Sequence, residues 1–160
     1  ITTFDSAILS QPLELAVDAV ARVNPPADRV VGVAGPMRTE VFAFGRMPLS
    51  FSARCFTARH HRLQKDECEF RCRDDADGLL LKSDEGQPFL VLNGTQTQSA
   101  ALQCLIDDVA ALHAAGVSSL RLSPCSQNFA RVIELYLGSL SFPVVAVGHA
   151  VAAADGRVDL

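Results

Sequence analysis

The stretch RCFTARHHRLQKDECEFRCR (residues 54–73) holds three of the five cysteines of the chain, Cys55, Cys68 and Cys72, in the spacing Cys-x12-Cys-x3-Cys. Cys68 and Cys72 are four positions apart, so a helical conformation would place both sulfur atoms on one face, on successive turns. Cys55 would then close the site from a second segment. Soft thiolate ligands favour an iron-sulfur cluster or zinc over cations that prefer oxygen. The polar residues between the cysteines make a poor core segment, so we predict a metal site here.

The same stretch is basic, although the whole chain carries a net charge of -4. It contains six Lys and Arg residues against three acidic ones. Cationic side chains offset the negative charge that thiolate ligands bring to a metal site. The charge therefore suits any thiolate-ligated metal, and it leaves open a contact with an anionic substrate or a nucleic acid.

Length and composition set the outer bounds of the prediction. With 160 residues, 49% of them hydrophobic, the chain can bury a core, and one domain over residues 1–160 is expected. The sequence lacks a signal-peptide pattern and a run of roughly 18 apolar residues, and its odd number of cysteines favours a reducing compartment. We therefore expect a cytoplasmic protein. Because the chain starts with Ile1, we also expect it to be the C-terminal portion of a longer protein.

Hydrophobic periodicity predicts an alternation of helices and strands. Helices are predicted over residues 10–23, 99–116 (capped by Ser99) and 126–140. Strands are predicted over residues 29–34, 39–44, 49–53, 79–83, 89–93 and 117–122. Strands that alternate with helices indicate an α/β fold with a parallel sheet, but these strands are too few to close a barrel. The predicted fold is the C-terminal part of a TIM-type (β/α) barrel with a cysteine-bearing, strand-rich insertion.

The segment EVFAFGRMPLSFSARCFTARHH (residues 40–61), which continues through Lys65-Asp66-Glu67-Cys68 to Cys72, resembles the collagenase-like peptidase family U32. The order of residues in this segment and the cysteine spacing resemble the ubiquinone-biosynthesis branch of the family, most strongly over residues 39–72. That resemblance implies a TIM-barrel-type protein with a 4Fe-4S cluster on four cysteines, three grouped and one far upstream. Cys55, Cys68 and Cys72 match the grouped three. Nothing before Cys55 is a cysteine, so the fourth ligand is expected from sequence upstream of this chain.

The resemblance also implies a function. Proteins of this branch support oxygen-independent (anaerobic) hydroxylation of ubiquinone precursors. They are components of a hydroxylase, and they act as heterodimers with a related cluster protein while a lipid-binding carrier presents the apolar intermediate. The resemblance assigns no catalytic residue in this chain. Other branches of the family modify RNA or are named peptidases.

Several alternatives remain open from the residues alone. His60 or His61 could complete a structural Cys3His zinc site. A hydrolase would use Cys55 as nucleophile with a nearby histidine as base, but no third orienting group is recognisable. Nucleic-acid binding is disfavoured because the chain is acidic overall and has no interleaved aromatic and basic platform.

Two other cysteines could supply a fourth ligand. Cys125 is predicted at a junction between a strand and a helix, although a small packed residue is also usual there. Cys104 is predicted to fall off the apolar stripe of its helix. Four further residues are predicted near strand ends, where a site contact and an ordinary surface position are equally consistent with the sequence: Arg46, Arg54, Asn93 and Ser123.

Overall fold

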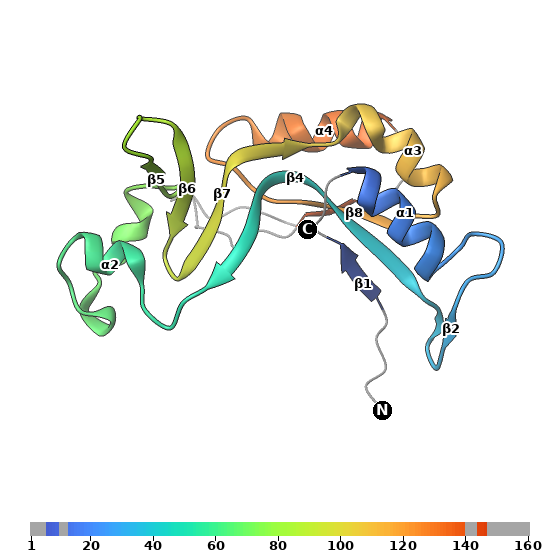
Figure 1. Cartoon of the computed structure of the whole chain (residues 1–160), viewed down its shortest axis with the longest axis horizontal. Coiled ribbons are helices and arrows are strands. Elements are labelled where there is room, and N and C mark those ends of the chain that lie inside the picture. Colours follow the sequence, from blue (N-terminus) through green and yellow to red (C-terminus); the bar gives the residue numbers. More distant parts are fainter. Residues whose placement is uncertain (1–5, 10–12, 140–143, 147–160) are drawn as a thin grey trace. The chain divides into compact units, whose positions relative to one another are not determined.

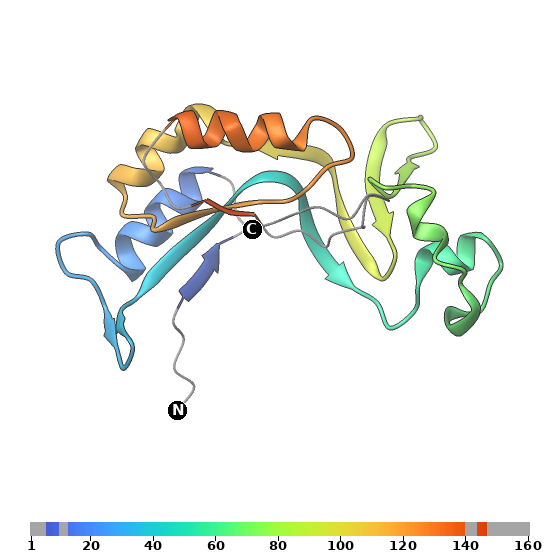
Figure 2. The same ribbon diagram turned by 180° about the vertical axis from the view of Figure 1, so that it is seen from behind.

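The computed structural model describes residues 6–9, 13–139 and 144–146, which fall into two compact units (Figures 1 and 2). The helix-bearing unit contains the described residues up to 45, residues 103–123 and the described residues from 127 onward. The cysteine unit contains residues 46–102 and 124–126. Strand β4 (Arg38–Phe51) is shared, because it leaves the first unit at Gly45 and enters the second at Arg46.

The helix-bearing unit is built on a parallel sheet in the order β1-β4-β8-β9. Its other strands are β1 (Ser6–Leu9), β8 (Ser119–Leu122) and β9 (Val144–Ala146). Helices α1 (Leu13–Val23), α3 (Val109–Ala114) and α4 (Phe129–Ser139) lie on one face of this sheet (Figures 1 and 2). The 3-10 helix η3 (Ile106–Asp108) leads into α3. The predicted α/β class with parallel strands is therefore present, and the assignment to the C-terminal part of a TIM-type barrel stays a prediction.

Helix α1 ends where the sequence predicted, before Asn24-Pro25-Pro26. The Asn24 side chain is fully buried, donates to the Met37 carbonyl at 2.8 Å and accepts from the Val30 amide at 3.0 Å. A buried amide needs such partners, and here they fasten the start of the hairpin that follows α1. The predicted cap Ser10 lies outside the described residues.

Two strand predictions need correction. Residues 29–34 do not form one extended strand, because the chain turns back in a short hairpin, β2 (Val31–Gly32) with β3 (Gly35–Pro36). Residues 39–44 and 49–53 were predicted as separate strands, but residues 39–44 and 49–51 belong to one strand, β4, which continues through Pro48 and ends at Phe51. Pro48 is exposed in the last part of β4, where the loss of one amide donor is tolerated.

The cysteine unit is an antiparallel arrangement. Strands β5 (Leu79–Lys82) and β6 (Pro88–Asn93) form the predicted hairpin, and β6 pairs with β7 (Gln96–Cys104). The unit also holds helix α2 (Phe56–His60) and two 3-10 helices, η1 (Lys65–Glu67) and η2 (Arg71–Arg73).

The prediction of one helix over residues 99–116 is wrong in its first half. Residues 96–104 form β7, and only residues 109–114 form helix α3. The pairing Asn93↔Gln96 leaves Gly94-Thr95 as a two-residue turn, and Gly94 has a φ of 60°, which favours glycine. The Asn93-Gly94 pair was the signal that could have revealed this hairpin. Pairing of β7 with β6 on one side and with β4 on the other outweighs the helical spacing of the apolar residues, since short apolar runs do not fix the period.

Tyr136 anchors α4 on β4 in the helix-bearing unit. Its hydroxyl donates to the Ala43 carbonyl at 2.8 Å and accepts from the Leu105 amide at 3.1 Å. Its ring meets Phe44 edge to face, with centroids 6.4 Å apart. Burial raises the pKa of Tyr136, so the hydroxyl keeps its proton and remains a donor.

We expect Tyr136→Phe to lower the free energy of unfolding by about 1 kcal/mol. The loss stays modest because the Leu105 amide also donates to the Ala43 carbonyl, at 2.9 Å. Urea unfolding measures the change. Leu137→Ala on the same helix is the control, because Leu137 is 53% exposed and should alter stability by less than about 0.5 kcal/mol. Equal stability of Tyr136→Phe and wild type would contradict this role.

Candidate functional site

Cys55 is placed by the end of β4 and by the turn between β6 and β7. The Ser52 amide donates to the Thr95 carbonyl at 2.8 Å, and the Phe56 amide donates to the Gly94 carbonyl at 2.7 Å. Cys55 is then the N-cap of α2, where its Sγ accepts from the Ala58 amide at 3.4 Å. The predicted position of the cysteine loop directly after a strand is confirmed.

Cys68 and Cys72 do not share the face of one helix, so that expectation is wrong. Cys68 closes η1, Cys72 lies in η2, and the chain between them passes through Glu69 and Phe70 with φ values of 52° and 53°. Left-handed residues of this kind interrupt a right-handed helix. The Cys72 thiol instead points to the Phe70 carbonyl, with 3.8 Å between sulfur and oxygen.

The elements that carry the three cysteines nevertheless lie together in the cysteine unit. Helix α2 contacts η2 and β6. Cys55, Cys68 and Cys72 are all half-buried, so each thiol is neither enclosed in a core nor fully exposed. Such partial exposure is typical of cysteines that take part in metal or redox chemistry.

Within the described ranges, no three His, Cys, Asp or Glu side chains are grouped closely enough to hold a metal ion. His60 and His61 pack edge to face against each other, with ring centroids 5.1 Å apart, and both are exposed. The predicted cluster and the zinc alternative both remain predictions. The donor set itself, three thiols on adjoining elements, fits a thiolate-ligated group.

Charged residues in and next to the loop between Cys68 and Cys72 pair with one another. Arg71 pairs with Glu69 at 2.9 Å and with Asp74 at 3.5 Å, and its hydrogen bond to Glu69, followed by that to Asp74, raises the pKa of Arg71. The Arg73 guanidinium lies 5.3 Å from the centre of the Phe70 ring. These contacts are exposed, so each contributes little to stability.

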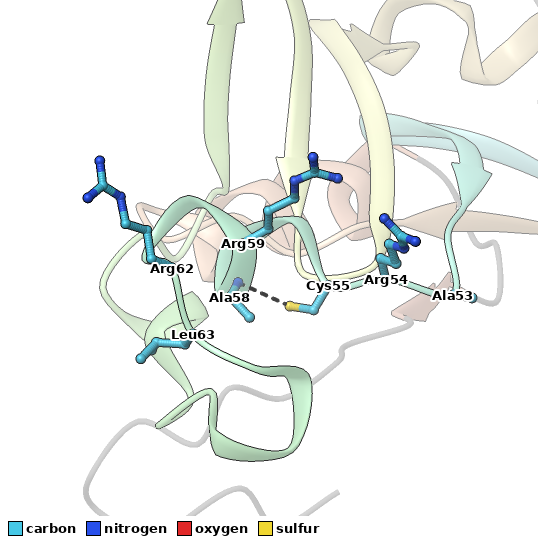
Figure 3. Close-up of a pocket in the computed structure, with 7 residues that line it drawn as sticks. All are labelled: Ala53, Arg54, Cys55, Ala58, Arg59, Arg62 and Leu63. Atoms are coloured by element: carbon cyan, nitrogen blue, oxygen red, sulfur yellow. Dashed lines mark hydrogen bonds between the residues drawn. The ribbon is translucent and has the colours of Figure 1, made fainter.

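A pocket of about 310 Å³ opens beside Cys55 (Figure 3). Its lining combines three arginines with apolar groups and the cysteine: Ala53, Arg54, Cys55, Ala58, Arg59, Arg62 and Leu63. In Figure 3 the side chains of Arg54 and Arg59 extend to the same side of α2, whereas Arg62 extends away from them. The Cys55 sulfur turns inward to the Ala58 amide.

The other two cysteines have different surroundings. Cys125 is half-buried in the cysteine unit, where the adjacent Ser126 bonds to Asp77 through both its amide, at 2.7 Å, and its hydroxyl. Cys104 was predicted on a helix but lies at the end of β7, exposed in the helix-bearing unit, with its sulfur 3.9 Å from the Tyr136 hydroxyl.

The remaining predicted positions near strand ends serve different contacts. Arg46 donates to the carbonyls of Ser99 and Ala100, which joins β4 to β7. Asn93 pairs with Gln96 beside the β6–β7 turn, and the Ser123 amide donates to the Phe44 carbonyl at 2.8 Å. Of these predicted residues, Arg54 lines the pocket beside Cys55.

Comparison with known proteins gives a family match. The sequence profile of Peptidase family U32 matches residues 5–137, which is most of the chain. No solved structure matches it. In the part of the chain that the structure describes, no helix is long and apolar enough to cross a membrane.

We expect Cys55→Ala and Cys55→Ser to differ in the metal-free chain. Alanine cannot accept the Ala58 amide, so exchange of that amide should accelerate about fivefold, which corresponds to about 1 kcal/mol for a lost N-cap. Serine is a good N-cap and should keep the amide protected. Hydrogen exchange measured by NMR separates the two variants, and Cys104→Ala is the control. Equal exchange in both Cys55 variants would show that the sulfur does not cap α2.

Proposed function

Because this chain belongs to peptidase family U32, we propose that it is a UbiV-like iron-sulfur protein that supports oxygen-independent hydroxylation in ubiquinone biosynthesis. Cys55, Cys68 and Cys72 are the proposed ligands of a 4Fe-4S cluster. We propose that the fourth ligand of this cluster comes from sequence upstream of Ile1. The cluster would supply electron transfer or organise the site in which the ubiquinone precursor is hydroxylated.

One observation supports the proposal: three half-buried thiols lie in one unit within a basic segment, and the elements that carry Cys55 and Cys72 contact each other. Cys55 is the N-cap of α2, and Cys72 lies in η2, which is in contact with α2. The Cys55 sulfur caps α2 by accepting a hydrogen bond from the Ala58 amide, and an N–H···S bond of this kind tunes a cluster ligand. Residues of this chain would thus bind and electrostatically balance the cluster.

The proposed partners follow from the proposed UbiV-like assignment. We place the chain in the cytoplasm as a heterodimer with a UbiU-like cluster protein. A UbiT-like lipid carrier would deliver the ubiquinone precursor, since an isoprenoid substrate is poorly soluble in water.

A hydrolytic role is less well supported by the site. A cysteine nucleophile needs a base within hydrogen-bond reach. Among the described contacts, the Cys55 sulfur accepts only the Ala58 amide, and His60 and His61 pack against each other. A structural zinc site would use the same thiols, so metal analysis has to separate zinc from iron.

We expect the longest natural form of this chain, purified without oxygen, to contain about four irons and four acid-labile sulfides per protein. Cys55→Ser, Cys68→Ser and Cys72→Ser should each lose most of both, because each removes one thiolate ligand. Iron, sulfide and zinc analysis together with the absorption spectrum measures the outcome.

Two cysteine variants serve as controls. Cys104→Ser removes an exposed thiol of the helix-bearing unit and should keep the cluster. Cys125→Ser should keep it as well, and cluster loss in this variant would make Cys125 the fourth ligand. One zinc without sulfide would replace the redox proposal by a structural zinc site.

A further inference from the structure

The pocket beside Cys55 carries positive charge that the described part of the protein does not neutralise. Several arginines elsewhere are engaged by oxygen atoms: Arg29, Arg46, Arg71, Arg121 and Arg131. In the described ranges, Arg54, Arg59 and Arg62 form no ion pair and no side-chain hydrogen bond. Three cations around one hollow raise its electrostatic potential and attract an anion.

The form of the pocket favours a small anionic ligand. Its volume of about 310 Å³ lies at the lower end of the range for small-molecule sites. Ala58, which is 2% exposed, and Leu63 give it an apolar wall, and such a wall strengthens electrostatic attraction at its surface. Arg54 and Arg59 extend to the same side of α2, so their planar guanidinium groups can share one oxyanion (Figure 3).

We propose that this pocket binds a compact oxyanion, the phosphoryl or carboxylate group of a small molecule, through Arg54 and Arg59. The ligand would sit next to Cys55, because both arginines and the cysteine line the same hollow. This inference goes beyond the proposed cluster function, and it holds whichever metal the cysteines bind.

Isothermal titration calorimetry of the full chain tests the site, with inorganic phosphate and malonate titrated separately at constant ionic strength. Wild type should show saturable binding at a stoichiometry of one for at least one of the two anions. Phosphate alone would identify a phosphoryl ligand, malonate alone a carboxylate ligand, and both a general oxyanion site. We expect Arg54→Gln combined with Arg59→Gln to weaken binding at least about tenfold, because both bidentate donors are lost.

The matched control is Arg22→Gln combined with Arg131→Gln, which removes the same charge from exposed residues outside the pocket. It should bind within about twofold of wild type. Arg59→Lys keeps the positive charge but loses the planar guanidinium group, so its affinity for the anion should lie between those of wild type and the double variant. Heat without saturation for both anions, or equal affinity in the pocket and control variants, would overturn the proposal. Iron analysis of the same samples reports separately on the cluster, so the two proposals fail independently.

Discussion

One strand, β4, imposes the constraint on which both units depend. Its residues 39–45 are buried within the parallel sheet, and from Arg46 onward it becomes progressively exposed before it delivers Cys55. The change occurs at Gly45, where φ is 121° and a Cβ would lie 2.5 Å from the Cβ of Ser123. Only glycine meets both conditions without strain. The same strand thus supplies core packing at its start and positions the candidate ligands at its end.

Much of this architecture could be predicted where a local pattern and a partner agree. The buried run 39–44 and the hairpin of β5 with β6 were predicted from periodicity and turn residues, and both are confirmed. Helix α4 is confirmed as well, but it begins at Phe129 and not at the predicted cap Ser126, which bonds to Asp77. The prediction failed over residues 99–104, because apolar residues at helical spacing also fit a strand, and β7 lies between β6 and β4 in the sheet once Gly94 turns the chain. The Asn93-Gly94 pair marks the turn into β7, whereas the pairing of β7 with β4, which is distant in sequence, leaves no mark in a short window.

The site was predictable in residue type but not in local conformation. Spacing alone placed Cys68 and Cys72 on one helix, whereas Glu69 and Phe70 adopt left-handed conformations between them. Each such residue costs on the order of 1–3 kcal/mol and persists only where its surroundings impose it. Turn hydrogen bonds cross this loop, from the Arg71 amide to the Cys68 carbonyl at 3.1 Å and from the Arg73 amide to the Phe70 carbonyl at 3.0 Å, beside the exposed ion pairs of Arg71 and the cation–π contact of Arg73. The spacing of the cysteines records none of these conformations, so the local path of the loop could not be predicted from it.

The basic residues of the cysteine segment divide into two sets with different physical roles. Arg71 and Arg73 contact Glu69, Asp74 and Phe70, so their charge is already engaged by neighbouring residues of the same segment. Arg54 and Arg59 face a pocket whose other lining is largely apolar, so their charge remains available to a ligand. A local excess of positive charge that merely balanced thiolates would not need this division. The separation argues that the segment both holds the cysteines in place and presents a second, anionic binding position beside one of them.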